Sequence, residues 1–216
     1  MLWRSGTSEE REFLESKIDT THYLQPIELF PNPLSVGLSL FCENGNCLVL
    51  TKRTKLPSSG GLLFGGSIYN AVGESVALVD VDGDYQGKTR LSIWRTAKRG
   101  LREEMGIDFF GGKRESLVIH SLVWDNRMLD YKFFGHTING MSRAEVRRLW
   151  TNAPDRHESW DINFRDSSNR EQCLKIIQDI IANREEWGSE CILCTIRSLL
   201  HMKKISPEDF ESLLAK

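Results

Sequence analysis

The sequence lacks a long apolar run. No stretch approaches the ~20 consecutive apolar residues that a helix needs to span a bilayer, and the mean hydropathy is −0.35. The first residues, MLWRSGTSEEREF, hold no apolar core of the kind that signal peptides have. From the sequence we therefore expect no membrane contact and a cytoplasmic location.

An excess of one charge is missing as well. The chain has 28 Lys and Arg against 30 Asp and Glu, which gives a formal net charge of −2 and an isoelectric point near 6.2. A nucleic-acid-binding domain usually has a basic patch and a high isoelectric point. We therefore expect no nucleic-acid partner. The content of 40% hydrophobic and 27% charged residues is ordinary for a globular protein.

Cysteine is scarce, and the number of cysteines, 5, is odd. An odd count without a secretory signal argues against a framework of disulfides. Cys191 and Cys194 form a CxxC, but no second CxxC exists and the apolar residues around them have helical spacing, so we expect both in the core. Cys42 and Cys47 flank ENGN, and we interpret them as small apolar residues at the two ends of a hairpin.

Patterns of several enzyme classes are absent. The segment GGLLFGG, residues 60–66, lacks the Lys-Ser/Thr ending of a P-loop and does not run into a helix. No two of the 5 histidines have the i, i+4 spacing of a helical zinc site. Nothing resembles a catalytic set of Ser, His and Asp. The function therefore has to be sought in acidic and basic residues.

Strand patterns around one central helix are present, followed by a helical tail. Asn44-Gly45 is a hairpin signal between apolar, β-rich runs. Strands are predicted at residues 34–42, 47–51, 116–124, 131–138 and 159–164. Helices are predicted at residues 7–18, 94–105, 142–150, 168–183, 190–202 and 206–215, with capping boxes at Ser142/Glu145 and Ser168/Glu171. This order indicates an α/β or α+β fold.

The central helix, WRTAKRGLREEMGID, ends in two adjacent glutamates. Its apolar residues at i, i+3, i+7 and i+11 form a core face, and Gly106 stands where a left-handed cap belongs. Glu103 and Glu104 lie near the negative end of the helix dipole, where a divalent cation such as Mg²⁺ would compensate them. The other interpretation is a solvated acidic turn, neutralised by the arginines of the helix: Arg95, Arg99 and Arg102.

The segment RGLREEMGI, residues 99–107, resembles the end of the Nudix box, the signature of hydrolases of nucleoside diphosphates linked to another group. Six positions match in register: Arg99, Leu101, Glu103, Glu104, Gly106 and Ile107. The preceding hairpin and the Gly-rich GGLLFGGSI resemble the strands that come before the box. The resemblance implies a Nudix-like α/β/α sandwich with a mixed sheet at residues 34–165, an N-terminal extension at 1–33 and a C-terminal helical addition at 166–216.

The chain departs from the family pattern at three positions. Gly100 replaces a box glutamate that serves the family as a metal ligand. Counting back, the first Gly and the first Glu of the box fall on Tyr85 and Leu91. The segment at residues 74–90 could hold a brief strand and is otherwise expected to be a long loop before the helix. A third acidic ligand could come from this loop, which holds four acids: Glu74, Asp80, Asp82 and Asp84. The sequence leaves open whether the site hydrolyses its ligand or only binds it.

The resemblance implies hydrolysis of a phosphoanhydride in a nucleotide-type small molecule, with Mg²⁺ or Mn²⁺ as cofactor. Glu103 and Glu104 would be ligands or general base, and Arg99 would orient Glu103. Lys52 and Arg53 either meet phosphates or form an ordinary charged strand end.

Further interpretations remain open. Glu158 is either a late acidic base or a solvated loop residue. The alternative function is a weakened nucleotide-binding sensor or partner-binding module, and a third is an interaction protein that docks through the C-terminal helices. A homodimer is implied by the resemblance alone.

Overall fold

The computed structural model describes residues 34–53, 68–77, 79–85, 88–108, 117–125 and 130–214. The helix expected at 7–18 and most of the Gly-rich segment GGLLFGGSI lie outside these ranges. The strands are β1 Leu34–Cys42, β2 Cys47–Lys52, β3 Ile68–Asn70, β4 Val72–Ser75, β5 Val81–Tyr85, β6 Lys88–Leu91, β7 Leu117–Asp125, β8 Asp130–Ile138 and β9 Asp161–Asp166. The helices are α3 Ile93–Met105, α4 Arg143–Thr151, α5 Arg170–Ala182, α6 Ser189–His201 and α7 Pro207–Leu214, with short 3-10 helices at Glu43–Gly45 and Arg156–Glu158.

The main sheet is mixed. β1 runs parallel to β8 and antiparallel to β2. β7 pairs with β8 at one edge of the sheet, and β9 pairs with β2 at the other. β1 and β2 pair only near the hairpin, at residues 40–42 with 47–49, and then diverge. β4 pairs with the free half of β1, and β3 with the free half of β2. β3 and β4 are separated by a single residue, Ala71, so this segment pairs first with β2 and then with β1.

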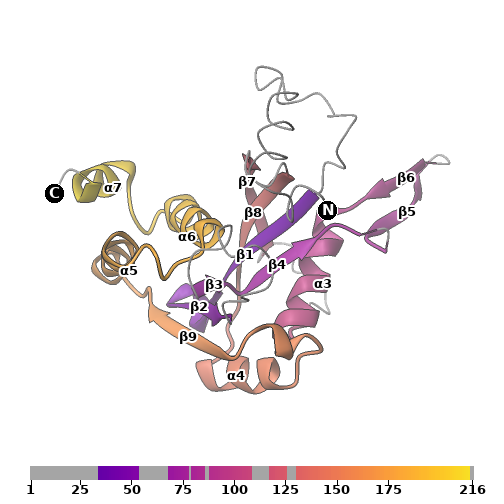
Figure 1. The fold of residues 1–216 in the computed structure, drawn as a ribbon, viewed down its shortest axis with the longest axis horizontal. Coiled ribbons are helices and arrows are strands. Elements are labelled where there is room, and N and C mark those ends of the chain that lie inside the picture. The colour runs from indigo at the N-terminus through magenta and orange to yellow at the C-terminus, as the bar shows by residue number, and fades with distance from the viewer. Residues whose placement is uncertain are drawn as a thin grey trace, which may run out of the picture.

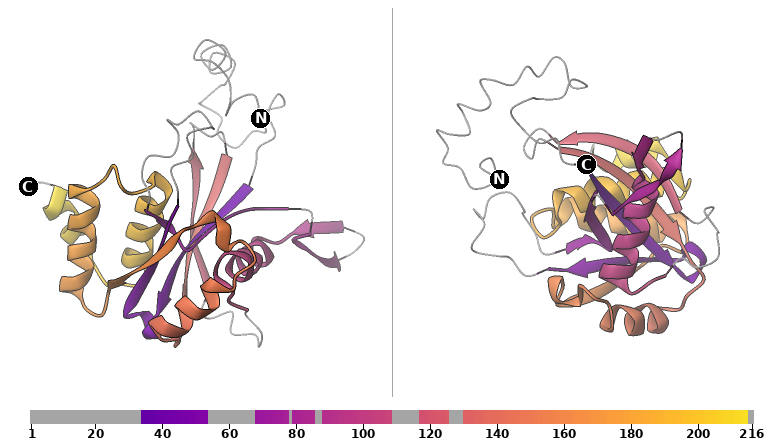
Figure 2. Two further views of the ribbon diagram at one scale, coloured as in Figure 1. Left: turned by 60° about the horizontal axis from the view of Figure 1, so that its bottom comes forward. Right: turned by 90° about the vertical axis from the view of Figure 1, so that its right-hand side faces the viewer.

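Helices cover both faces of this sheet, as Figures 1 and 2 show. One core lies between the sheet and α3 with α4, and its helical members include Ala97, Leu101 and Trp150. The second core lies between the opposite face and α5, α6 and α7, with Ile177 and Leu199 at its centre. Alternate residues of β1 and β2 face the two cores, as strand geometry requires. The expected mixed sheet flanked by helices is confirmed.

Helix ends follow the sequence signals, with one exception. Gly106 caps α3 in the left-handed region at φ 66°, and the Ser142/Glu145 capping box opens α4. The box expected at Ser168 and Glu171 is wrong. Asn169 caps α5 instead, and its side chain accepts from the peptide N–H of Gln172. Asn is as good a cap as Ser, so the sequence offered two adjacent candidates.

The segment before α3 differs from the expected loop. β5 and β6 pair antiparallel and form a second, separate sheet that projects from the main body (Figure 1).

All five cysteines are buried and free, so the expectation of core thiols at Cys191 and Cys194 is confirmed. None of the helices in the described ranges is long and apolar enough to cross a membrane.

Candidate active site at the end of α3

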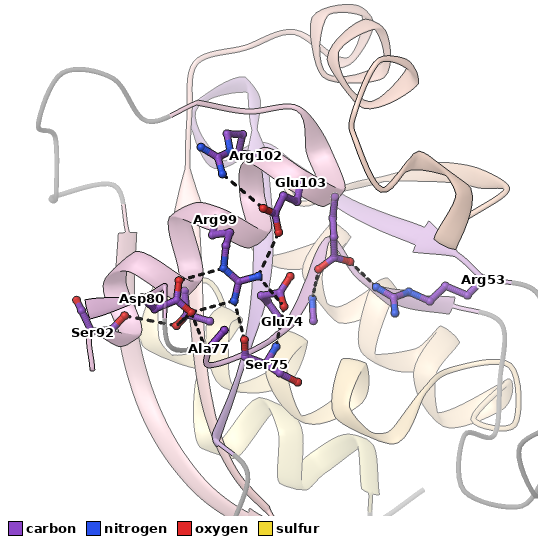
Figure 3. Close-up of polar contacts among 12 residues, drawn as sticks. Arg53, Glu74, Ser75, Ala77, Asp80, Ser92, Arg99, Arg102 and Glu103 are labelled. Atoms are coloured by element: carbon purple, nitrogen blue, oxygen red, sulfur yellow. Dashed lines mark hydrogen bonds and ion pairs between the residues drawn. The ribbon is translucent and has the colours of Figure 1, made fainter. Parts of the chain in front are cut away.

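Arg99 on α3 is the centre of a polar network (Figure 3). Its Nε donates to Asp80 Oδ1 at 3.0 Å, and its Nη2 donates to Asp80 Oδ2 at 2.9 Å and to the carbonyl of Ser75 at 2.7 Å. Its Nη1 lies 3.0 Å from Glu74 Oε1 and 3.1 Å from Glu103 Oε2. The pairing of Arg99 with Glu103 that the i, i+4 spacing predicts is therefore present, as one part of a larger network.

Asp80 anchors this network from the segment before β5. Its side chain is almost fully buried and accepts further hydrogen bonds from Thr96 Oγ1 and the peptide N–H of Ala77. Burial alone would raise the pKa of Asp80, but the hydrogen bonds from Arg99, Ala77 and Thr96 outweigh it and hold the pKa at about 2. With both oxygens engaged, Asp80 acts here as the partner of Arg99.

Gly100 has no room for a side chain. A Cβ built on it would lie 2.5 Å from Val72 Cγ1 and 3.0 Å from Glu74 Cβ, so α3 packs directly on β4 at this point. The side chain of Glu74 occupies the space that the box glutamate would need, and its carboxylate reaches Arg99 beside that of Glu103. Burial raises the pKa of Glu74, and the Arg99 charge opposes that shift. The carboxylate that is missing from the helix at Gly100 is thus matched by the carboxylate of Glu74 on β4.

Glu104 follows Glu103 on α3 and points about 100° away from it around the helix. It is 6% exposed, accepts from the peptide N–H of Gly73 at 2.8 Å, and forms a close ion pair with Arg53 Nη2. Burial raises the pKa of Glu104 to about 7, although Arg53 and the Gly73 N–H pull it down. The exposed Glu158 reaches the other nitrogen of Arg53, Nη1, at 3.5 Å. Arg53 and Glu158 therefore do lie at the same site as Glu104.

The structure separates the remaining candidates. Lys52 lies on the other face of the strand from Arg53, with its Nζ 5.1 Å from the ring centroid of Trp160. Asp82 and Asp84 belong to β5, and their side chains lie outside the described part of the chain. Sequence analysis did not single out Trp160. Its signal would have been an aromatic residue two positions after Glu158, just before a strand.

The fit of a divalent cation depends on both the donors and their arrangement. Among the described residues, no group of three or more His, Cys, Asp or Glu side chains is placed to hold a metal ion. The donors themselves are carboxylate oxygens, which Mg²⁺ and Mn²⁺ prefer. Glu74 pairs with Arg99 and Glu104 with Arg53, so an arginine already meets each of these two carboxylates. The chemistry of the donors fits such a cation, provided that the arginines give up some of their present contacts.

No protein-family profile matches the chain, and no curated protein sequence matches it. Several solved structures resemble it. DR0079 from Deinococcus radiodurans is 12% identical over 81% of this chain and 88% of its own, with a TM-score of 0.44. The NUDIX domain of Shewanella oneidensis NrtR, complexed with ADP ribose, is 14% identical over 78% and 96%, with a TM-score of 0.37.

The C. elegans Ap4A hydrolase is 14% identical over 72% of this chain and 93% of its own, with a TM-score of 0.31. The structures similar to this chain thus include Nudix proteins, the family that residues 99–107 resemble. At these identities and TM-scores the likeness supports neither an activity nor a ligand.

Proposed function

We propose that the chain hydrolyses a phosphoanhydride bond of a nucleoside diphosphate linked to another group, with Mg²⁺ or Mn²⁺. The observation that carries the proposal is the pair formed by Gly100 and Glu74. Gly100 removes one carboxylate from the helix, and Glu74 brings another to the same space from β4. A helix end that served only as a solvated surface would have no use for this replacement.

Two carboxylates that meet at Arg99 would hold the cation: Glu74 and Glu103. When bound, it would supply positive charge that neutralises the negative charge developing on the phosphates. Arg99, fixed by Asp80, orients Glu74 and Glu103. Glu104, whose pKa of about 7 suits proton transfer near neutral pH, is our candidate general base.

Arg53 has two roles in this proposal. In the structure it pairs with Glu104, and its Nε is buried and has no hydrogen-bond partner among the residues that the structure describes. A diphosphate offers oxygens that match a guanidinium well. On binding, Arg53 would turn from Glu104 to the phosphates, and this exchange frees the Glu104 carboxylate in the step that brings the substrate in.

The test is product release from a panel of nucleoside diphosphate derivatives with Mg²⁺ or Mn²⁺. We expect turnover that requires the cation, and a loss of about 100-fold or more in kcat/KM for Glu74→Gln, Glu103→Gln and Glu104→Gln. The matched control is Glu211→Gln, an exposed acid on α7, which should turn over like the wild type. Full activity in Glu74→Gln would remove Glu74 from the set, and full activity in all three variants would refute the proposal.

A second function is favoured by the arginine contacts themselves. Five carboxylates share three guanidinium groups among the described residues of the site, and each carboxylate already has an arginine partner. An arrangement closed in this way suits a module that binds a nucleotide without hydrolysing it. That function predicts no turnover of any compound, together with a melting temperature that rises with ligand concentration.

A further inference from the structure

Exposed apolar side chains gather where the β5–β6 sheet joins the main body. Val79, Leu91 and Trp94, which we call the root cluster, are 69%, 49% and 38% exposed. They are three of the eight large hydrophobic side chains that are exposed in the described part of the chain. Single exposed apolar residues are common on protein surfaces, whereas a group of them marks a surface that binds a partner.

The root cluster surrounds one hydrogen bond. The peptide N–H of Ser92 donates to the carbonyl of Asp80 at 2.7 Å, and this bond closes the root of the sheet. Val79 precedes Asp80 by one position, Leu91 precedes Ser92 by one, and Trp94 follows Ser92 by two. The three exposed side chains therefore belong to one place on the surface.

The sheet that continues from this root has no support from the rest of the described chain. β5 and β6 pair only with each other and project from the main body (Figures 1 and 2). A sheet of two strands is at best marginally stable in water by itself. Val81 pairs directly with Leu91, so these two apolar residues share one face of the sheet. An unsupported sheet with an apolar root is expected to pack against another surface.

The charges of the two strands indicate what that surface is. β5 holds the acids Asp82 and Asp84, and β6 holds the bases Lys88 and Arg90. A two-fold dimer that sets β5 of each copy against β6 of the other brings opposite charges together twice, whereas like strands would repel each other. A membrane surface or a nucleic acid would favour an excess of basic residues, which these two strands do not have.

We propose that the root cluster and the β5–β6 sheet form the interface with a second copy of this chain. Each copy contributes the same surface, as in any two-fold dimer. The interface lies in the stretch where the resemblance to the Nudix box is lost, at Tyr85 and Leu91, so it is a feature of this chain and not of the box. The inference does not depend on the proposed hydrolysis.

Sedimentation velocity of the full chain over a range of concentrations tests the dimer. We expect the wild type to sediment with twice the 24.8 kDa mass of the chain. Leu91→Asp buries an unpaired charge in the root cluster of each copy and should weaken the dimer by about 100-fold or more. The matched control is Leu214→Asp on α7, where the replaced side chain is 60% exposed, and this variant should dimerise like the wild type.

A charge exchange tests the pairing of β5 with β6. Asp82→Lys combined with Asp84→Lys makes the charges of the sheet all basic, and Lys88→Glu combined with Arg90→Glu makes them all acidic. Each of these variants alone should be monomeric because its copies repel, and an equimolar mixture of the two should form a heterodimer. Far-UV circular dichroism establishes that each variant is folded.

Several outcomes would overturn the proposal. One is a wild type that stays monomeric at every concentration. Others are a dimer that Leu91→Asp leaves intact or that Leu214→Asp dissociates, because the interface would then lie elsewhere. A mixture of the basic and acidic variants that stays monomeric would refute the arrangement of opposite strands.

Discussion

The two faces of the sheet bury polar groups in opposite ways. On the α3 face several buried groups are charged, and acids and arginines pair with one another around Arg99 and Glu104, beside neutral groups such as Thr96. On the α6 face they are mostly neutral, apart from the ion pair of Lys132 with Glu190. The neutral groups of that face are the side chains of Ser39, His120, His136, Cys194, Thr195 and Ser198.

The difference separates packing from function. Cys194 and Ser198 hydrogen-bond to backbone carbonyls of β1 and β8, which is enough to dock α6 on the sheet. Burying charges is costly even when they are paired, and apolar residues often replace buried ion pairs without loss of stability. The α3 face keeps its charges despite this cost, which is what a site that must meet a charged ligand would require.

The largest effect on the free energy of unfolding is expected for Asp80, which holds Arg99 in place on the α3 face. Asp80→Asn removes one of the three carboxylates that pair with Arg99 and should destabilise the protein by about 2–3 kcal/mol, the free energy that corresponds to lowering the Asp80 pKa from 3.8 to about 2. Urea unfolding at pH 7 measures it. Glu171→Gln, in the exposed Glu171–Lys175 pair, is the control and should unfold like the wild type. Equal stability of the two variants would mean that the Asp80 pair contributes no more than a surface pair.

The next effect concerns the contact that excludes the box glutamate. Gly100→Ala forces a methyl group against Val72 and Glu74 and should cost about 2 kcal/mol of unfolding free energy by overpacking. Gly73→Ala, on the same strand, is the matched variant, because its Cβ would meet only Arg53 Nη2 at 3.9 Å. If Gly100→Ala were as stable as Gly73→Ala, the close packing of α3 on β4 would be wrong.

These two contacts show what the sequence could not predict. The hairpin, the core face of α3 at Ala97, Leu101 and Met105, and the Gly106 cap follow from patterns within a few residues and were predicted; Trp94, the first residue of the predicted face, is 38% exposed instead. The pairing of Asp80 with Arg99 and of Glu74 with Gly100 depends on how β4 and the segment before β5 lie across the helix. Those residues are 19 and 26 positions apart, and the intervening β5–β6 hairpin was expected to be a loop. The exposed Trp160 was missed because one aromatic residue in a sequence carries no signal of its exposure.

A smaller effect tests the buried carboxylate directly. The folded-state pKa of Glu104 is about 7 against a model-compound value of 4.5, so the folded chain holds a proton that the unfolded chain has lost between these values. Stability from this group is present below pH 4.5 and declines as the pH rises to 7. Glu104→Gln should therefore be more stable than the wild type by about 1–2 kcal/mol at pH 8, with the gain vanishing toward pH 4.5. Thermal unfolding across this range measures the difference, and a difference independent of pH would contradict the raised pKa.

The smallest effect belongs to the neutral face, where the pH dependence has the opposite sign. The rings of His120, His136 and His201 lie in mutual contact, with centroids 5.3–5.6 Å apart. Burial, followed by the neighbouring His120 and His201, lowers the pKa of His136 from 6.5 to about 4. The unfolded chain therefore binds a proton that the folded chain refuses, and stability is lost as the pH falls from 6.5 to 4.

His136→Gln cannot take up this proton in either state. Whatever it costs in packing at neutral pH, it should lose about 1 kcal/mol less than the wild type between pH 6.5 and 4. His157→Gln changes an exposed histidine and should follow the wild-type curve. Parallel curves for wild type and His136→Gln would mean that the buried ring is protonated as easily in the folded chain as in the unfolded one. The α6 face would then tolerate charge as the α3 face does, and the contrast between the two faces would no longer mark the site.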